Sequence, residues 1–280
     1  MTSVGAVVTV LERRYPPTWA ESWDRVGLVL GEPAARVDTV LLVVDCVPQI
    51  VEQAVALGAQ LIVAHHPLLL RGVASVAPTT YKGRIVHRLI KADIALFTAH
   101  TNADVAASGV SDALAGRLGL VGVHPLRPVS EAPERGTGRI GTLPVPVSLA
   151  DFTRLVEAAL PPTAWGVRAA GDPDREVRTV AVCGGSGDPF LADAVRAGVD
   201  AYVTADLRHH PVSEHVAEGG PALIDAAHWA TEHPWLDFAA AELSAALGVR
   251  AVVSDLDTDP WTVHAPTTAR RSSDAKELRP

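Results

Sequence analysis

The segment EQAVALGAQLIVAHH at residues 52–66 has a near copy later in the chain, ADAVRAGVDAYVTAD at residues 192–206. In each copy, residues with helical spacing end at a glycine and are followed by a short apolar run. A Val-rich run precedes each copy, at 40–44 and at 180–183. Each half therefore predicts a strand, a helix and a second strand, which indicates an internal duplication.

A third apolar run in each half leads into a histidine with an acidic residue four positions later. The run at 94–98 leads into His100 and Asp104, and the run at 222–224 leads into His228 and Glu232. Strands alternating with helices of this length predict an α/β fold with largely parallel sheets, where functional groups gather beyond the carboxyl ends of the strands. We therefore expect two similar three-layer α/β lobes with the site in the cleft between them.

The expected domain organisation follows from a break in composition. The stretch at 125–146 is rich in Pro and Gly and is interpreted as the joint between the lobes. The prediction is a first lobe at 1–124, this joint, a second lobe at 147–266 and a disordered polar tail at 267–280. In the second lobe, Ser148 predicts the start of a helix that runs to about Leu160, and Pro234 the start of a helix that runs to Leu247.

The composition indicates a folded, soluble and cytoplasmic protein. Of 280 residues, 48% are hydrophobic, and the net charge of -8 gives no general attraction for a phosphate backbone, so nucleic acid is not an expected partner. No apolar run approaches the roughly 18 residues of a membrane span, and no secretion signal is predicted at the start. Cys46 and Cys183 end apolar runs and are predicted to be buried, reduced thiols.

His65, His66 and Pro67 form the sharpest chemical feature of the chain. Successive strand residues point to opposite faces of a sheet, so adjacent histidines can converge on one site only if the strand has ended. Pro67 favours such an ending. Each neutral imidazole can then bind a metal ion through one nitrogen. For the dipeptide alone, the alternative is one buried and one exposed histidine.

Two further pairs of a histidine and a carboxylate follow strands. In AHTNAD, Asp104 can bridge two cations and His100 can bind a metal, orient a ligand or shuttle a proton, although an aspartate that caps a turn is the alternative. In DAAHWATEHP, the spacing of His228 and Glu232 is that of a metal-binding helix. The residue before a proline avoids the α region, so Pro234 instead predicts that both lie in a loop before the next helix.

Together these residues form a mixed set of nitrogen and oxygen ligands that suits Zn, Fe, Mn or Co. The candidate ligands are His65, His66, Asp104, His228 and Glu232. Because five protein ligands exceed the usual four of a closed zinc site, we expect two divalent transition-metal ions per subunit, with open positions that favour catalysis.

No other cofactor site is expected. The GGSG sequence at 184–187 lacks the Lys and Ser or Thr of a P-loop, so a tight turn competes with an anion cradle. Residues that either serve the site or are simply solvated are Lys82, Arg84, Arg208, His209, His210 and His215.

Six motifs spread over nearly the whole chain carry a resemblance to a known family. They are WDRVGL at 23–28, LIVAHHP at 61–67, HTNAD at 100–104, GGSG at 184–187, TADLRHH at 204–210 and DAAHWATE at 225–232. With these motifs the chain resembles the Nif-three-like dinuclear metal-centre proteins, also named type 2 GTP cyclohydrolase I. The resemblance implies metal ligands at the same five positions, and none is missing. One departure is Ala205, where many members have Gly, and it concerns the shape of that loop.

The resemblance also implies an assembly and an activity. The assembly is a homohexamer, a hollow toroid whose metal sites face the cavity, and a small nucleotide-like substrate is the other expected partner. The activity is that of a GTP cyclohydrolase, in which activated water attacks C8 of the purine and formate is released, with His100 or His210 as the proton shuttle. Phosphoester hydrolysis by the same metals and a metal-binding or regulatory scaffold without turnover are the alternatives.

Overall fold

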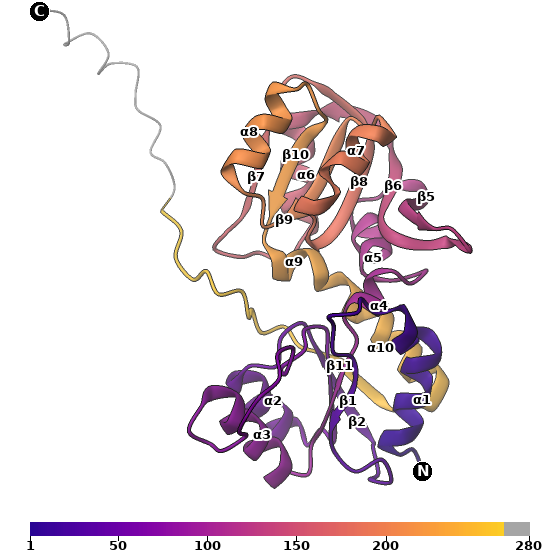
Figure 1. The fold of residues 1–280 in the computed structure, drawn as a ribbon, viewed down its shortest axis with the longest axis vertical. Helices are drawn as coiled ribbons and strands as arrows, with labels where there is room; N and C mark the ends of the chain where they lie inside the picture. The colour runs from indigo at the N-terminus through magenta and orange to yellow at the C-terminus, as the bar shows by residue number, and fades with distance from the viewer. Residues whose placement is uncertain (266–280) are drawn as a thin grey trace, which may run out of the picture.

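The computed structural model describes residues 1–265 and shows two α/β lobes that meet at a helical region (Figure 1). The first lobe holds a five-stranded sheet in the order β1-β4-β3-β2-β11. Its strands are β1 (Gly27–Leu30), β2 (Thr39–Val43), β3 (Leu61–Ala64), β4 (Ala95–Thr98) and β11 (Arg250–Val253). All neighbouring pairs are parallel except β1 and β4, which pair antiparallel.

The second lobe holds a six-stranded sheet in the order β5-β6-β8-β9-β10-β7. Its strands are β5 (Val121–Val129), β6 (Ala132–Ser148), β7 (Val167–Ala170), β8 (Glu176–Ser186), β9 (Ala201–Ala205) and β10 (Ala222–Ala226). The order β8-β9-β10-β7 repeats β2-β3-β4-β1, with three parallel strands and one antiparallel edge strand in each lobe. This repetition is consistent with the predicted duplication.

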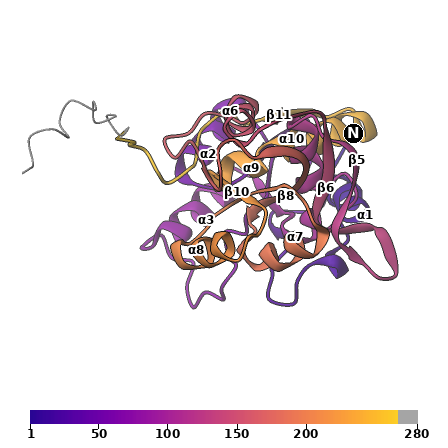
Figure 2. The ribbon, with the colours of Figure 1, turned by 90° about the horizontal axis from the view of Figure 1, so that it is seen from above.

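Helices cover both faces of each sheet, which confirms the three-layer α/β arrangement. The α-helices are α1 (Val4–Arg14), α2 (Pro48–Leu57), α3 (Tyr81–Lys91), α4 (Thr101–Asp104), α5 (Val110–Arg117), α6 (Leu149–Ala159), α7 (Leu191–Ala197), α8 (His209–Ala217), α9 (His228–Glu232) and α10 (Pro234–Leu247). In the first sheet, Leu41 belongs to the apolar cluster under α2 and α3, whereas Val40 belongs to the cluster under α1 and α10. Figure 2 shows α6 on one side of the second sheet and α7 and α8 on the other.

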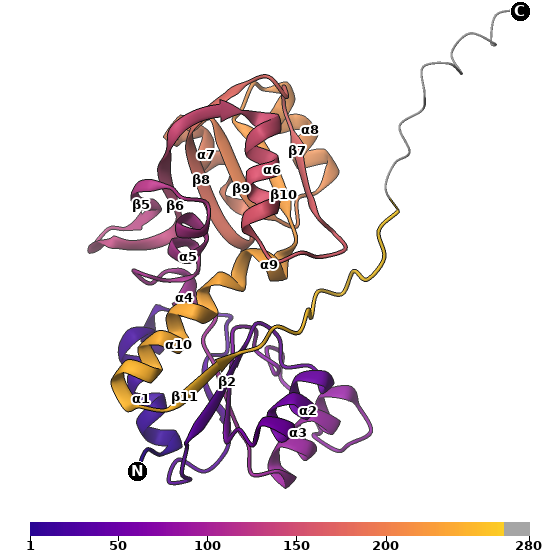
Figure 3. The same cartoon turned by 180° about the vertical axis from the view of Figure 1, so that it is seen from behind.

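One apolar core continues from the first lobe into the second. It includes Val40 of the first sheet, Ile224 of the second and Trp235 at the start of α10. Trp235 is fully buried, and its indole nitrogen donates a hydrogen bond of 3.0 Å to the hydroxyl of Tyr15. Figure 3 shows α10 running from α9 toward the first lobe, where β11 lies beside β2. This shared core fixes the strand ends of the two lobes relative to each other.

Two of the expected domain boundaries do not match the sheets to which the strands belong. The stretch at 125–146 is not a joint, because it lies in β5 and β6 of the second sheet. Its prolines fit there because Pro125 and Pro128 stand in an edge strand, where a missing backbone donor is tolerated. In addition, β11 returns from the predicted second lobe to the first sheet, through its pairing with β2.

The local predictions within the second lobe are confirmed. Helix α6 begins after Ser148, whose hydroxyl accepts the backbone N–H of Asp151 at 3.1 Å, and α10 begins at Pro234. Cys46 and Cys183 are buried free thiols, as predicted. Between residues 1 and 265, no helix is long and apolar enough to cross a membrane. The tail predicted at 267–280 lies outside the described residues.

Candidate metal centre

Six side chains meet where β3, β4 and β10 end, between the two lobes. We call them the metal-site cluster: His65, His66, His100, Asp104, His228 and Glu232. Two overlapping groups, one of His65, His66 and His100 and one of His66, His228 and Glu232, each place their ligand atoms within 4.8 Å of one another. The five ligands expected from the sequence therefore come together, and His100 joins them.

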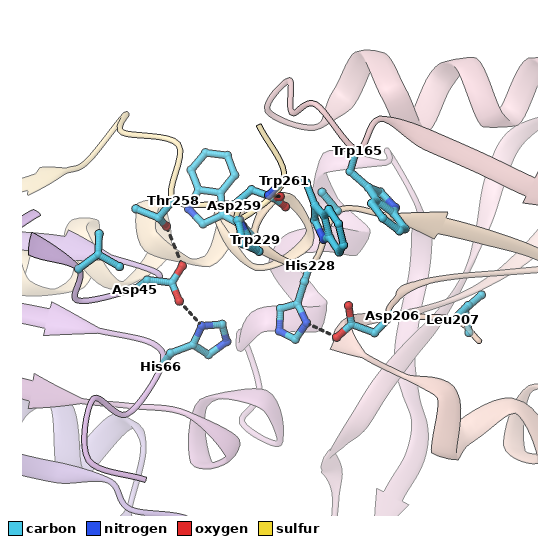
Figure 4. A pocket seen from close by; sticks show the side chains of 14 residues that line it. Asp45, His66, Trp165, Asp206, Leu207, His228, Trp229, Thr258, Asp259 and Trp261 are labelled. Atoms are coloured by element: carbon cyan, nitrogen blue, oxygen red, sulfur yellow. Dashed lines mark hydrogen bonds and ion pairs between the residues drawn. The ribbon is translucent and has the colours of Figure 1, made fainter. Parts of the chain in front are cut away.

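The carboxylate of Glu232 lies at the centre of the metal-site cluster. Its Oε1 is 3.0 Å from Nε2 of His228 and 3.4 Å from Nε2 of His65, and its Oε2 is 3.0 Å from Nε2 of His66. Asp104 approaches from the other side, with Oδ1 at 3.7 Å from Nε2 of His65. Figure 4 shows His66 of the first lobe and His228 of the second lobe close together, with ring centroids 5.2 Å apart.

All four imidazoles of the cluster are held in the same way. Nδ1 of His65 donates to the carbonyl oxygen of Ala99 at 2.9 Å. Nδ1 of His66, His100 and His228 each donate to a carboxylate, on Asp45 at 2.7 Å, Asp24 at 2.9 Å and Asp206 at 2.7 Å, respectively. Because each partner accepts, the neutral ring keeps its proton on Nδ1, and Nε2 can bind a metal ion once any proton on it has been displaced. This is the arrangement found for histidines that bind metals.

The atoms that point into the cluster lack the partners that buried polar atoms require. Nε2 of His65, Oδ1 of Asp104 and Oε2 of Glu232 are buried and make no hydrogen bond among residues 1–265, since Oε2 lies 3.0 Å from Nε2 of His66 without the geometry of a hydrogen bond. Leaving such atoms unsatisfied costs about 1–3 kcal/mol each, and more for charged groups. A cation at this position would satisfy all three, so the residues fit the expected metal ions.

The electrostatics of the cluster favour a bound cation. Burial acts to raise the pKa of Glu232, but His228, His66 and His65 together hold it well below its usual value. Burial acts to lower the pKa of His65, but the Glu232 and Asp104 carboxylates raise it. Positive charge therefore stabilises the buried carboxylates, and a metal ion that binds here would displace protons from the imidazoles.

The position of His228 and Glu232 corrects one expectation. They do not lie in a loop but form the first and last residues of the short helix α9, so their i, i+4 spacing puts both on one face. His233, which precedes Pro234, nevertheless adopts helical angles, with φ -50° and ψ -39°. Tertiary contacts override the preference against this conformation, because Nε2 of His233 donates to the carbonyl of Ser254 at 3.1 Å and its ring packs on Trp229.

The GGSG segment forms the end of β8 and brings its backbone against the cluster. Gly185 has φ +66°, and a Cβ built on it would lie 2.3 Å from Oε1 of Glu232 and 3.0 Å from Nε2 of His228. Its N–H donates to the hydroxyl of Thr231 at 2.9 Å. The segment is therefore not the predicted tight turn but an irregular end of β8, where the pairing with β9 shifts between Val182 and Ser186 and the missing side chain of Gly185 leaves room for Glu232 and His228.

The other candidate residues lie away from the cluster. His209 and His210 are exposed at the start of α8, so the proposed shuttle role of His210 has no support from its position. Arg208 pairs with Asp188 at 2.5 Å, and His215 contacts the carbonyl of Pro221 at 3.0 Å. Lys82 and Arg84 lie on α3, where Arg84 is exposed.

Sequence reasoning missed the three aspartates that hold the imidazoles. Asp45 follows β2, Asp206 follows β9, and Asp24 precedes β1. The first two stand at the carboxyl ends of parallel strands, where functional groups are expected, so this rule could have identified them. Asp24 carried no comparable signal, because only the folded chain brings it beside His100.

Comparisons with known proteins agree with this geometry. A protein of Streptomyces coelicolor named GTP cyclohydrolase 1 type 2 homolog is 52% identical over 279 residues, which cover 96% of this chain and 98% of that protein. A Mycobacterium tuberculosis protein of the same name is 40% identical over 92% of this chain and 96% of its own length. The crystal structure of a Bacillus cereus protein related to NIF3 has a TM-score of 0.85 at 25% identity, and covers 93% of this chain and 99% of that chain.

A crystal structure of a hypothetical protein from Staphylococcus aureus superimposes equally well, with a TM-score of 0.85 at 26% identity over 93% of this chain and 98% of that one. The model of the Duf34/NIF3 (NGG1p interacting factor 3) family matches residues 2–260. These matches confirm the resemblance drawn from the sequence motifs. The chain belongs to the Duf34/NIF3 family.

Proposed function

We propose that this protein is a hydrolase that depends on a dinuclear metal centre in the metal-site cluster. The observation that carries the proposal is the common orientation of four imidazoles, each of which turns Nδ1 to an oxygen acceptor and Nε2 toward Glu232 or its neighbours. A structural role alone would not require four preoriented rings around a buried carboxylate.

The cluster divides naturally into two sets of ligands. His65, Asp104 and Glu232 would hold one ion, and His66, His228 and Glu232 would hold the other, with Glu232 shared between them. When bound, the ions would supply Lewis acidity and lower the pKa of water. A set of nitrogen and oxygen donors suits Zn, Fe, Mn or Co, and the choice among them is open to experiment.

His100 is the best placed group for moving a proton. Its ring centroid is 5.2 Å from that of His65 and 5.6 Å from that of His66. Asp24, which is 6% exposed, accepts from Nδ1 of His100 and also from the backbone N–H and hydroxyl of Thr101. Burial acts to raise the pKa of Asp24, but His100 and Thr101 lower it below its usual value, so it stays charged and holds the His100 ring in place.

The substrate we propose is a purine nucleotide such as GTP, which would take up two water molecules: the first would open the imidazole ring at C8 to a formamide, and the second would hydrolyse the formamide to formate and an amine. The support for it is the name GTP cyclohydrolase 1 type 2 homolog borne by the similar proteins, together with a site that can activate water and move a proton. We further propose that the chain acts as a homohexamer, as its family resemblance implies, and that it does so in the cytoplasm, in keeping with the buried free thiols of Cys46 and Cys183.

A metal-loaded activity screen tests the function. The purified chain is loaded separately with Zn, Mn, Fe and Co, its metal content is measured, and release of formate and of phosphate from GTP is followed. We expect about two ions per chain and formate release. The matched control is Glu232→Gln, which keeps the size of the side chain but removes its charge, and should lose at least one ion.

The other possible results would each indicate a different function for the site. Phosphate release without formate would replace the proposed reaction by phosphoester hydrolysis. A fully loaded site that releases neither product from a panel of nucleotides would support a metal-binding scaffold. An unchanged metal content in Glu232→Gln would remove Glu232 from the ligand set and contradict the shared-ligand arrangement.

A further inference from the structure

A pocket of about 580 Å³ opens directly beside the metal-site cluster, between the two lobes (Figure 4). His66 and His228 form its metal-side wall, and Asp45 and Asp206 stand behind these rings. The pocket is therefore continuous with the groups that would hold the ions. A molecule that reacts at the cluster has to extend into this space.

The far side of the pocket is formed by two tryptophans from distant parts of the chain. Trp165 precedes β7 in the second lobe and packs partly buried against the core. Trp261 follows β11 and is 58% exposed. Their ring centroids are 5.4 Å apart with an interplanar angle of 42°, so the two indoles form an angled wall, which Figure 4 shows beside His228.

Polar contacts position the Trp165 ring and the backbone that carries Trp261. The guanidinium of Arg168 lies 4.6 Å from the ring centroid of Trp165 and is itself paired with Asp225 at 2.7 Å. The backbone N–H of Trp261 donates to Oδ1 of Asp259 at 2.8 Å. The segment before it is tied to the first lobe, since the hydroxyl of Thr258 donates to Oδ2 of Asp45 at 2.6 Å.

The charge of the pocket selects against a phosphate and in favour of a group with N–H donors. Asp206 and Asp259 each line it, and the hydrogen bonds within residues 1–265 use Oδ2 of Asp206 and Oδ1 of Asp259, which leaves the second oxygen of each to accept from a ligand. Asp206 and Asp259 would repel a dianionic phosphate placed against them, so any attraction between phosphate and the bound ions would act at the metal side of the pocket and not at these carboxylates. A flat ring would instead stack on an indole, as bases do on aromatic side chains.

We propose that this pocket binds the substrate through a planar nitrogen heterocycle with N–H groups, stacked on Trp165 and Trp261 and hydrogen-bonded to Asp206 or Asp259. This inference rests on the proposed function, because it places the ring to be opened beside the metal ions. It extends that function by assigning the recognition of the ring to residues outside the metal-site cluster. The phosphates of a nucleotide would then point away from the tryptophan wall.

Binding of guanosine to the zinc-loaded protein, measured by calorimetry, tests the inference without requiring turnover. Ribose 5-phosphate serves as the comparison ligand, since it lacks the ring. Trp261→Leu should weaken guanosine binding by roughly ten-fold or more, as expected from the contribution of one stacking side chain. Trp261→Phe, which keeps an aromatic face, should bind guanosine within about three-fold of the wild type.

Two further variants guard against an indirect effect. Phe238→Leu removes another exposed aromatic ring, 43% exposed on α10 and outside the pocket lining, and should leave guanosine binding unchanged. Trp165→Leu removes the second indole without altering the segment that carries Trp261, and should also weaken binding. Circular dichroism of each variant confirms that the chain is folded.

The outcomes separate this inference from the proposed function. Wild-type protein that holds its metals but does not bind guanosine, or binds ribose 5-phosphate equally well, would overturn the inference and leave the metal centre intact. Unweakened binding in both tryptophan variants would do the same. If no metal is bound, the proposed function fails, while guanosine binding to the same sample still decides whether the aromatic wall recognises the ring.

Discussion

Replacement of Gly185 by alanine is expected to weaken metal binding, although it changes none of the proposed ligand residues. The structure gives Gly185 a left-handed conformation, with φ +66°, in which an L side chain costs about 1–2 kcal/mol. A Cβ at this position would also stand 2.3 Å from Oε1 of Glu232 and 3.0 Å from Nε2 of His228. Both the backbone and the site therefore oppose the substitution.

The two costs can be separated by a matched variant in the same lobe. Gly198 has φ +65°, and a Cβ built on it meets nothing within 4 Å, so Gly198→Ala has the backbone cost alone. At Gly185 the oxygen of Glu232 must also move by about 1 Å to reach an ordinary carbon–oxygen contact of roughly 3.3 Å. A displaced central ligand should lower metal affinity by about 10–100-fold, the range seen when the groups that support metal ligands are removed.

The assay is a competition between each variant and a coloured zinc chelator, combined with thermal unfolding in excess chelator. We expect both variants to lose stability without metal, and Gly185→Ala to lose more. Only Gly185→Ala should lose zinc affinity. If Gly185→Ala and Gly198→Ala hold zinc as tightly as the wild type does, the close contact between β8 and Glu232 has no role in shaping the site, and the reasoning fails.

Three more predictions follow from other contacts. Asp24→Asn should reduce formate release by about 10-fold or more with unchanged metal content, because Asp24 holds His100; equal rates would refute that role. Asp200 accepts hydrogen bonds from the backbone N–H groups of Arg178 and Thr179. Burial acts to raise the pKa of Asp200, but these hydrogen bonds lower it below its usual value. The carboxylate should therefore stabilise the fold fully above pH 3.8, and this stabilisation should be lost as the pH falls further. Asp200→Asn should flatten this part of the stability profile in chemical denaturation, whereas a profile parallel to the wild type would contradict it. Light scattering at micromolar concentration should give a mass of about six chains, with a melting temperature that rises with concentration, and a monomer with bound metal would exclude the hexamer.

The local patterns of the sequence predict β2, β3, β4, β8, β9 and β10 and the candidate ligands that follow them. The apolar run 61–64 matches the bounds of β3, and Pro67 indicates that the strand ends before His65 and His66, so both can reach one site. In both cases the prediction depends only on residues that are a few positions apart in the chain. The fold class and the residues that meet in the metal-site cluster were therefore accessible from the sequence.

The features that sequence reasoning missed depend on contacts between distant residues. The pairing of β11 with β2 and the contact between Asp24 and His100 join segments far apart in the chain, and no local pattern encodes them. The prolines and glycines of 125–146 have the same composition in a linker and in an edge hairpin, so only the partner strand β8 distinguishes the two. His233 is helical before a proline because its side chain reaches Ser254.

The duplication also explains why residues 1–265 form one metal-site cluster and not one in each lobe. Val40 pairs with Leu61 in the first sheet, and Val180 pairs with Ala201 in the second at the same spacing, so the two halves can be placed in register. Gln60 accepts the N–H groups of Asp38 and Thr39, just as Asp200 accepts those of Arg178 and Thr179. Counted onward along the sequence, these pairs align Gly185 with Asp45 and Asp206 with His66, and the pairing of β8 with β9 shifts between Val182 and Ser186, just before this point.

Equivalent positions thus have different roles in the two lobes. His66 offers Nε2 to the cluster, whereas Asp206, its equivalent, supports the ring of His228 from behind. Asp45 supports His66, whereas its equivalent, Gly185, has no side chain because Glu232 occupies that space. A second copy of the centre would need histidines at 205 and 206, where Ala205 and Asp206 stand, and a carboxylate at 185, which would collide with Glu232. Glu232 can therefore lie at the centre of the cluster only because the second lobe has no side chain at position 185.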